Sequence, residues 1–343
     1  MKNFTHLKNR LATLLLIGAL SNSFQTFAQQ EAMFSQYMFN TLAINPAYAG
    51  SRDVLSLTTL GRYQWVGVDG APTTYTFSLD MPIKNEKMGI GLQASYDGIG
   101  LAKNTGLYLT YSYRVKVGPR STLAFGVNGG ATNVRWALSD AQNVGNDPVF
   151  GGTLDVNRFL PNVGGGIYLS NDRGYIGISC PQIMQNSISN YNFVSTDSLA
   201  AGKKSTDGKT RRHYFAMMGF VIGKGSFKIK PSTMLRYTQG APLGIDGNIN
   251  FWIKDKISFG VSGRLSQFQN FSQENGFDAA IGMMELQLTP QLKMGYAYDF
   301  TNSKLNDQSK TGKNRAIGIP THEVMLRYEF GFGKNKILTP RYF

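Results

Sequence analysis

Hydrophobic and polar residues alternate along most of this chain. In the stretch 107–117, LYLTYSYRVKV, every second residue is Leu, Tyr or Val, and the residues between them are Tyr, Thr, Ser, Arg and Lys. The same period of two recurs at 257–262, 292–300 and 324–330. Because successive side chains of a strand point to opposite faces, each segment predicts a strand with one apolar and one polar face.

This alternation predicts fourteen strands, separated by connections of two kinds. Short turns such as 118–120 and 171–173 alternate with long connections such as 98–104, 135–160 and 302–319. Bacterial outer-membrane barrels show this arrangement, with the short turns in the periplasm and the long loops outside, whereas a soluble sandwich has no reason to sort its loops. We therefore predict an all-β fold, a single transmembrane antiparallel outer-membrane β-barrel. The expected strands are 54–61, 73–81, 87–97, 105–117, 121–134, 161–170, 174–181, 211–223, 225–237, 245–254, 256–266, 276–288, 290–301 and 320–331.

Two places depart from regular strands. Met283-Met284 interrupts the alternation and predicts a β-bulge. Pro231 lies within an expected strand and cannot donate a ladder hydrogen bond, which predicts a bulge or a distortion. Glycines on the polar faces, such as Gly126, Gly260 and Gly295, are expected to leave room in the barrel interior or to allow curvature.

The chain divides into four parts. Residues 1–28 have a basic start, a short apolar run and small residues at the end, which predicts a secretory signal peptide cleaved after Ala28. Residues 29–53 are expected to form a periplasmic segment, or a plug tucked into the lumen from the periplasmic side. The barrel follows at 54–331 and a tail at 332–343. The single cysteine, Cys180, excludes an intramolecular disulfide.

The stretch 36–80 contains an aromatic lead-in, the run Asn45-Pro46-Ala47-Tyr48-Ala49-Gly50, and a loop at 64–72 between two expected strands. We predict that the lead-in and the loop approach each other through the barrel and occlude it. Trp65 has a second interpretation, as an aromatic residue of the membrane interface. The expected plug or partner contacts are Tyr37, Asn45, Pro46, Tyr48, Gln64, Trp65 and Pro72.

The formal net charge of +14 has two sources within the barrel. Lysines on or beside the expected short turns form a predicted basic rim, which either docks an acidic periplasmic partner or only contacts solvent and anionic lipid. They are Lys84, Lys87, Lys116, Lys224, Lys228, Lys254 and Lys256. Other basic residues lie on the polar strand faces, and we expect them to pair with Asp299, Glu285 and Glu329 in the lumen; an anion-selective pore is the alternative.

Catalytic and cofactor signals are weak. Only His213 and His322 follow the signal peptide, no Gly-x-Ser-x-Gly elbow is present, and His322-Glu323 has no partner at metal-ligand spacing. Gly126-Val127-Asn128-Gly129-Gly130 is not followed by a helix, as a phosphate-binding loop would be. We predict no enzymatic activity, no cofactor, no metal and no small-molecule substrate. Export of the chain also argues against a nucleic-acid partner.

Several short motifs resemble one family. Gln36-Tyr37-Met38, the run 45–50, Arg62-Tyr63-Gln64-Trp65 and Gly70-Ala71-Pro72-Thr73-Thr74 occur in the order of the PorP/SprF family pattern. Gly89-Ile90-Gly91, Asp97-Gly98-Ile99-Gly100 and the C-terminal Pro340-Arg341-Tyr342-Phe343 continue the resemblance, which covers essentially the whole mature chain.

The resemblance implies an outer-membrane component of the type IX secretion and gliding machinery of Bacteroidota. Its expected partners are a large secreted adhesin or the C-terminal domain of that adhesin, periplasmic and outer-membrane secretion components, and membrane lipids. The expected role is non-enzymatic support of adhesin secretion or surface anchoring. From the residues alone, an outer-membrane porin or a small-ligand channel remains the alternative.

Overall fold

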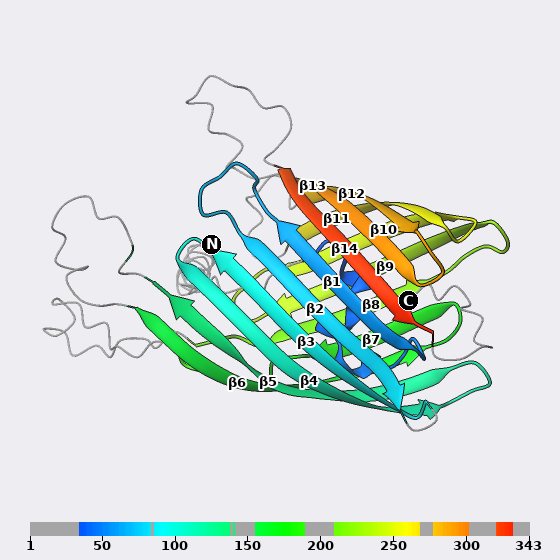
Figure 1. The fold of residues 1–343 in the computed structure, drawn as a ribbon, viewed down its shortest axis with the longest axis horizontal. Coiled ribbons are helices and arrows are strands. Elements are labelled where there is room, and N and C mark those ends of the chain that lie inside the picture. The colour runs from blue at the N-terminus through cyan, green and yellow to red at the C-terminus, as the bar shows by residue number, and fades with distance from the viewer. Residues whose placement is uncertain are drawn as a thin grey trace, which may run out of the picture.

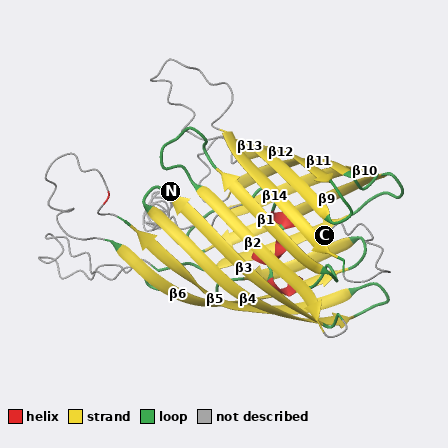
Figure 2. Ribbon diagram, in the orientation of Figure 1, coloured by secondary structure: helices red, strands yellow, loops and turns green. Residues whose placement is uncertain are grey.

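The computed structural model describes residues 34–83, 86–137, 140, 155–188, 209–267, 277–301 and 320–331, and its architecture is a closed antiparallel barrel of fourteen strands. The strands follow one another around the barrel in chain order (Figures 1 and 2). They are β1 Leu55–Tyr63, β2 Thr73–Ile83, β3 Met88–Ile99, β4 Ala102–Lys116, β5 Thr122–Trp136, β6 Val156–Ser170, β7 Gly174–Cys180, β8 His213–Phe220, β9 Phe227–Thr238, β10 Leu243–Ile253, β11 Ile257–Gln267, β12 Phe277–Gln287, β13 Leu292–Thr301 and β14 Pro320–Phe330.

The first and last strands close the sheet on itself. β1 pairs with β14 along its whole length, from Leu55 opposite Phe330 to Tyr63 opposite His322. Closure leaves no open sheet edge, which is the condition a β-structure must meet in a bilayer. The predicted strand number and fold are therefore confirmed.

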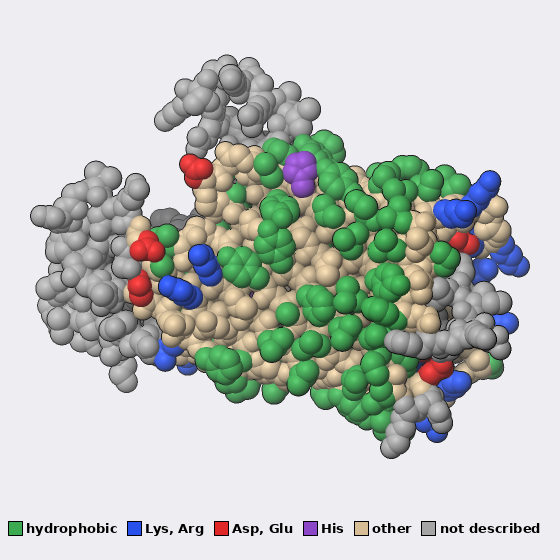
Figure 3. Space-filling view, viewed as in Figure 1, with side chains coloured by type: hydrophobic (Ala, Val, Ile, Leu, Met, Phe, Trp, Pro, Cys, Tyr) green, Lys and Arg blue, Asp and Glu red, His purple; other side chains and the backbone are tan. Residues whose placement is uncertain are grey.

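The two faces of the wall differ as the alternation predicts. On β4, Leu107 and Leu109 point outward and are 56% and 67% exposed, whereas the inward Thr110 and Ser112 are buried. Apolar side chains form a belt around the middle of the molecule, and charged side chains lie toward its ends (Figure 3). This is the distribution expected of a barrel whose outer face contacts lipid. No helix in the described part of the chain is long and apolar enough to cross a membrane.

The connections define two ends of the barrel. We call the end with the β4–β5, β6–β7, β10–β11 and β12–β13 turns the short-turn end, and the other end the long-loop end. By analogy with bacterial barrels the short-turn end faces the periplasm. One connection at the long-loop end is shorter than predicted: in place of a loop at 98–104, β3 and β4 pair up to Ile99 opposite Ala102, so that only Gly100 and Leu101 form the turn.

The predicted irregularities have different outcomes. The prediction of a bulge at Met283-Met284 was wrong, because both residues pair in continuous register with β11 and with β13. The register shift lies instead between Arg264 and Leu265, opposite the start of β12. Pro231 does mark a distortion. The β8–β9 ladder stops at Gly219 opposite Ser232, and an isolated bridge between Ile222 and Ile229 follows in the same register.

Residues 34–53, which we call the lumen segment, lie inside the barrel before β1 begins. The segment forms three short 3-10 turns, Tyr37–Phe39, Thr41–Ala43 and Pro46–Tyr48, drawn in red in Figure 2. Most of its side chains are buried, and its apolar residues form one core cluster with inward residues of the wall, such as Tyr168 and Met325. The lumen is thus packed by the chain itself.

Candidate functional site

The lumen segment spans the height of the barrel. Ser35 bonds to Asp299, near the end of β13, and therefore lies toward the long-loop end. Gly50 donates its N–H to Asp80, and Asp53 pairs with Arg114, near the end of β4, so these residues lie toward the short-turn end. The sequence predicts a periplasmic segment or a plug entering from the periplasmic side. In the structure, the first described residues of this segment lie at the opposite end.

A buried charge network holds the start of the lumen segment. The guanidinium of Arg62 lies 2.7 Å from Asp299 and 2.9 Å from Glu323. The Glu323 carboxylate also accepts the backbone N–H groups of Ser35 and Gln36, at 2.8 and 2.7 Å. The Ser35 hydroxyl donates to Asp299 and accepts from Arg62. Charge-assisted hydrogen bonds are the strong class, and here they tie three separate parts of the chain together.

The network extends along the inner wall. Arg264 pairs with Asp246 at 2.8 Å and approaches Asp299 to 3.8 Å, and Arg236 pairs with Asp246 at 3.1 Å. Toward the short-turn end, Lys293 pairs with Glu285 at 3.5 Å. These contacts confirm the predicted lumen network for Asp299 and Glu285. Glu329, the third predicted acid, pairs with Arg52 of the lumen segment.

Inward glycines of the wall provide the space for the backbone of the lumen segment. A Cβ atom on Gly126 would lie 2.1 Å from the Ala47 nitrogen, and one on Gly89 would lie 2.0 Å from the Ala49 carbonyl oxygen. A Cβ atom on Gly166 would lie 2.2 Å from Asn45 Oδ1. Such distances are too short for any side chain, so these positions accept only glycine while the lumen segment is in place.

Side chains of the wall satisfy the polar backbone of the lumen segment. Ser112 donates to the Ala49 carbonyl at 2.7 Å, and Ser179 donates to the Ile44 carbonyl at 2.8 Å. Asn45 begins the third turn: its Oδ1 accepts the Ala47 N–H, and its Nδ2 donates to the Ile167 carbonyl of β6. A buried backbone needs such partners, since each unpaired polar group costs about 1–3 kcal/mol. The fit is thus polar as well as steric.

The predicted contact residues of the lumen segment are all buried in the lumen. Tyr48 packs edge-on against Tyr168 of β6 with ring centroids 5.6 Å apart, and Pro46 is the first residue of the third turn. Tyr37 is also buried, and it lines a small cavity on the side of the lumen segment that faces β8–β10.

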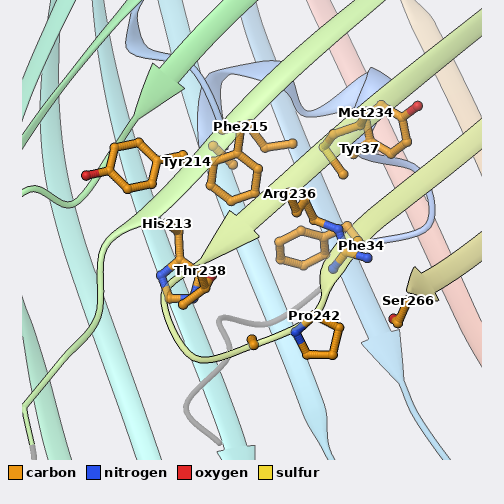
Figure 4. A pocket seen from close by; sticks show the side chains of 14 residues that line it. Phe34, Tyr37, His213, Tyr214, Phe215, Met234, Arg236, Thr238, Pro242 and Ser266 are labelled. Atoms are coloured by element: carbon orange, nitrogen blue, oxygen red, sulfur yellow. The ribbon is translucent and has the colours of Figure 1, made fainter. Parts of the chain in front are cut away.

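A small cavity of about 70 Å³ remains between the lumen segment and β8–β10. Figure 4 shows Phe34, Tyr37, Phe215 and Met234 around it, with Tyr214 directed away from the group. Arg236 is the charged residue at this cavity, and it is paired with Asp246. The size of the cavity and its mainly apolar lining are typical of a gap between packed side chains rather than of a solute-binding site.

The predicted contact loop, 64–72, lies at the long-loop end beside β14. The N–H of Val66 donates to the Pro320 carbonyl at 2.9 Å, and the Trp65 N–H donates to Thr321 Oγ1 at 3.3 Å. Gln64 bonds across the loop to Pro72, which is buried, whereas Gln64 and Trp65 are half-buried. The lead-in and this loop are the two segments predicted to occlude the barrel together. They are linked through Arg62, which precedes the loop and contacts Ser35 of the lumen segment.

The described members of the basic rim lie at the short-turn end. Lys87, Lys116, Lys224, Lys254 and Lys256 are exposed there. Lys228 is half-buried, and its Nζ lies 2.7 Å from both carboxylate oxygens of Asp255. Lys84 lies outside the described residues. The right-hand end of Figure 3 shows basic side chains at this end of the barrel.

The residues considered for catalysis are separated. His322 points outward, where its Nδ1 lies 2.7 Å from the Tyr296 hydroxyl, while Glu323 points inward to the lumen segment. His213 lies at the start of β8 beside the small cavity. Among the described residues no cluster of three His, Cys, Asp or Glu could hold a metal ion.

Sequence reasoning missed the residues that anchor the lumen segment, namely Ser35, Gln36, Arg62 and Glu323. A signal for two of them was present. Arg62 and Glu323 share the strand face of other inward residues, and each is a charged side chain that alternation directs into the barrel. Ser35 and Gln36 carry no comparable signal, because they lie outside any periodic segment.

These features define a class of protein: an outer-membrane β-barrel whose lumen is filled by its own N-terminal segment. The model of the family described as type IX secretion system membrane protein PorP/SprF matches residues 26–328. The chain belongs to the PorP/SprF family. The resemblance seen in the sequence motifs is confirmed.

Other comparisons give more distant likenesses. No curated protein sequence matches the chain. The monoaromatic hydrocarbon channel CymD is 11% identical, with 88% of this chain and 94% of that chain covered and a TM-score of 0.48. A FadL homologue of Pseudomonas aeruginosa is 14% identical, with 84% and 93% covered and a TM-score of 0.45. The outer membrane protein Omp33 of Acinetobacter baumannii is 11% identical, with 81% and 98% covered and a TM-score of 0.44.

Proposed function

We propose that this chain is a non-enzymatic outer-membrane component of the type IX secretion machinery that supports secretion or surface anchoring of a large adhesin. Its partners would be the adhesin or its C-terminal domain, together with other secretion components. A role in gliding would follow if the adhesin serves motility. Membership of the PorP/SprF family supports the general role.

The observation that carries the proposal is the filled lumen. A solute channel needs a continuous water-filled path, whereas here the lumen segment is packed against inward glycines and paired with buried charges. A barrel packed in this way offers its two ends and its outer face, not its interior, for interaction. This favours a scaffold or anchor over the alternative, a porin or small-ligand channel.

Gene deletion tests the proposal directly. The expected result is loss of one large surface protein from the deletion strain and its return when the gene is restored. Loss of uptake of a solute, with every surface protein retained, would support the channel instead. A matched restoration with Trp65→Ala tests the exposed contact loop separately: if the loop contacts cargo, barrel levels stay normal while surface display falls.

Gentle detergent extraction gives an independent test of the partners. We expect the chain to co-purify with an adhesin fragment or with secretion components, which can be identified by mass spectrometry. A chain that emerges alone and conducts ions in planar bilayers would contradict the proposal.

A further inference from the structure

The wall has a hollow on its membrane-facing side where β7 ends early. β7 pairs with β6 only from Gly165 to Ser170, and its pairing with β8 ends at Ser179 opposite Phe215. Beyond this point residues 181–188 run beside β6, with the Ile183 N–H donating to the Val163 carbonyl at 2.8 Å. The ladder between β7 and β8 is therefore interrupted on the long-loop side.

Small outward residues make the hollow deep, and large ones form its sides. Gly165, Cys180 and Ala216 form the floor, and the volume is about 550 Å³. Ile167, Ile178, Leu235, Tyr214 and Tyr237 surround it and are 39–55% exposed, as part of the apolar belt. The lining contains no charged side chain. A flexible apolar chain, such as a lipid acyl chain, suits this apolar lining and its position in the membrane-facing wall.

An apolar hollow alone does not select a lipid, because neighbouring acyl chains are as apolar as the hollow itself. Selectivity requires a polar contact beside the hollow, and one exposed cation, Arg212, is available there. Arg212 precedes β8 on the same outward face as Tyr214, and its Nε donates to the Ile183 carbonyl at 2.7 Å.

The aromatic pair at the hollow indicates that Arg212 lies at headgroup depth. Tyr214 and Tyr237 lie with ring centroids 6.2 Å apart on the outer face, the arrangement typical of the interface between hydrocarbon and headgroups. Arg212 lies two residues before Tyr214 in the chain, on the side toward the long-loop end. A phosphate at that depth would meet a guanidinium whose planar fork suits phosphate oxygens.

We propose that this hollow is a binding site for an anionic phospholipid, with one acyl chain over Gly165, Cys180 and Ala216 and the phosphate against Arg212. The site lies on the outer surface of the wall, whereas the lumen segment lies inside the barrel. The lipid proposal is therefore independent of the proposed function, and either can fail without the other.

Native mass spectrometry of the full chain in mild detergent tests the site with two lipids of identical acyl chains. Phosphatidylglycerol is expected to bind about fivefold more tightly than phosphatidylcholine, because one cation near a membrane surface contributes about 1 kcal/mol toward an anionic lipid, whereas the choline cation offsets the phosphate charge. Arg212→Gln should abolish the preference. Equal retention of the two lipids by the unaltered chain would overturn the proposal without any variant.

Cys180 provides a second readout, because it is the only cysteine and lies on the floor of the hollow. Phosphatidylglycerol should slow its alkylation by N-ethylmaleimide several-fold, and inorganic phosphate should not. Ala216→Phe should fill the hollow and reduce lipid retention, whereas Val127→Phe, on the exposed belt of β5, should not. Protection by phosphate alone, or equal loss of lipid in both Phe variants, would contradict an acyl-chain site.

Discussion

Single glycines on the inner wall decide whether the lumen segment fits. Gly126 and Gly129 lie three residues apart on β5, but only Gly126 faces the lumen segment. A Cβ atom on Gly126 would overlap the backbone of Pro46 and Ala47, whereas one on Gly129 would come no closer than 4.0 Å to Val163. The two positions therefore form a matched pair for measuring how tightly the segment is packed.

We expect Gly126→Ala to destabilise the barrel or expel the lumen segment. Overpacking a tight site typically costs about 1–3 kcal/mol. Gly129→Ala should be close to neutral. Urea unfolding in detergent, followed by tryptophan fluorescence, measures the difference, and equal midpoints for the two variants would contradict the tight seat described above.

At the charge network, Arg62 is the residue whose loss should cost most. Its side chain is 3% exposed and contacts two carboxylates that are 1% and 0% exposed. Removing one partner of a buried ion pair leaves an uncompensated charge, which costs about 3–5 kcal/mol. Arg62→Gln should therefore lower the free energy of unfolding by about this amount.

A rescue variant separates charge from shape at this site. Neutralising the partners as well, in the triple variant Arg62→Gln, Asp299→Asn and Glu323→Gln, should restore most of the stability, because no buried charge is left unpaired. The comparison again uses urea midpoints in detergent. A triple variant as unstable as Arg62→Gln alone would show that packing, not charge, dominates.

At the scale of elements, the strands were predicted, whereas the sequence left two positions open for the lumen segment, the periplasm or a plug inside the barrel. The strands carry period two, since one face contacts lipid and the other the polar lumen, and this signal locates β4 and β13 to within a few residues. The lumen segment is surrounded by wall on all sides, so no face of it is distinguished by solvent. Its run of Tyr, Asn, Pro and Ala indicated turns but not their place.

The pairing of buried charges was also predictable only within the strands. Alternation places Arg264 and Asp246 on the inner wall, and their pairing follows from their opposed positions on the neighbouring strands β11 and β10. Glu323 pairs with Arg62 on the neighbouring strand, but it also accepts the backbone N–H groups of Ser35 and Gln36, nearly the whole chain away. Contacts between a strand and the irregular lumen segment leave no pattern in the sequence around either residue. Such contacts hold the start of the lumen segment in place.

Deleting residues 36–48 should open the lumen without dissolving the wall. The wall's backbone hydrogen bonds run between strands, from β1 through to β14, and do not depend on the segment. We expect the intact chain to carry little steady current in planar bilayers and the deletion variant to conduct. Far-UV circular dichroism shows first that the variant keeps its strands; a folded variant that stays closed would mean that other parts of the chain block the lumen.

At the scale of the whole molecule, charge is arranged by end. The lumen cations are largely paired, so the interior contributes little to the field outside. The exposed lysines of the short-turn end are different, because they lie on turns at the rim. A basic rim attracts an acidic surface and mainly raises the rate and selectivity of association. This makes the short-turn end the place to test for docking of a periplasmic partner.

We expect charge reversal of Lys87, Lys116, Lys224 and Lys254 to glutamate to weaken co-purification with periplasmic secretion components, with the larger effect at low salt because screening reduces surface electrostatics. Lys228 is left unchanged since it pairs with Asp255. Lys103→Glu, an exposed lysine near the long-loop end, is the matched control and should retain the partners. Barrel levels in the membrane should be equal in all strains. If the fourfold reversal retains its periplasmic partners at low and at moderate salt, the rim only contacts solvent or lipid, and docking must depend on other surfaces of the barrel.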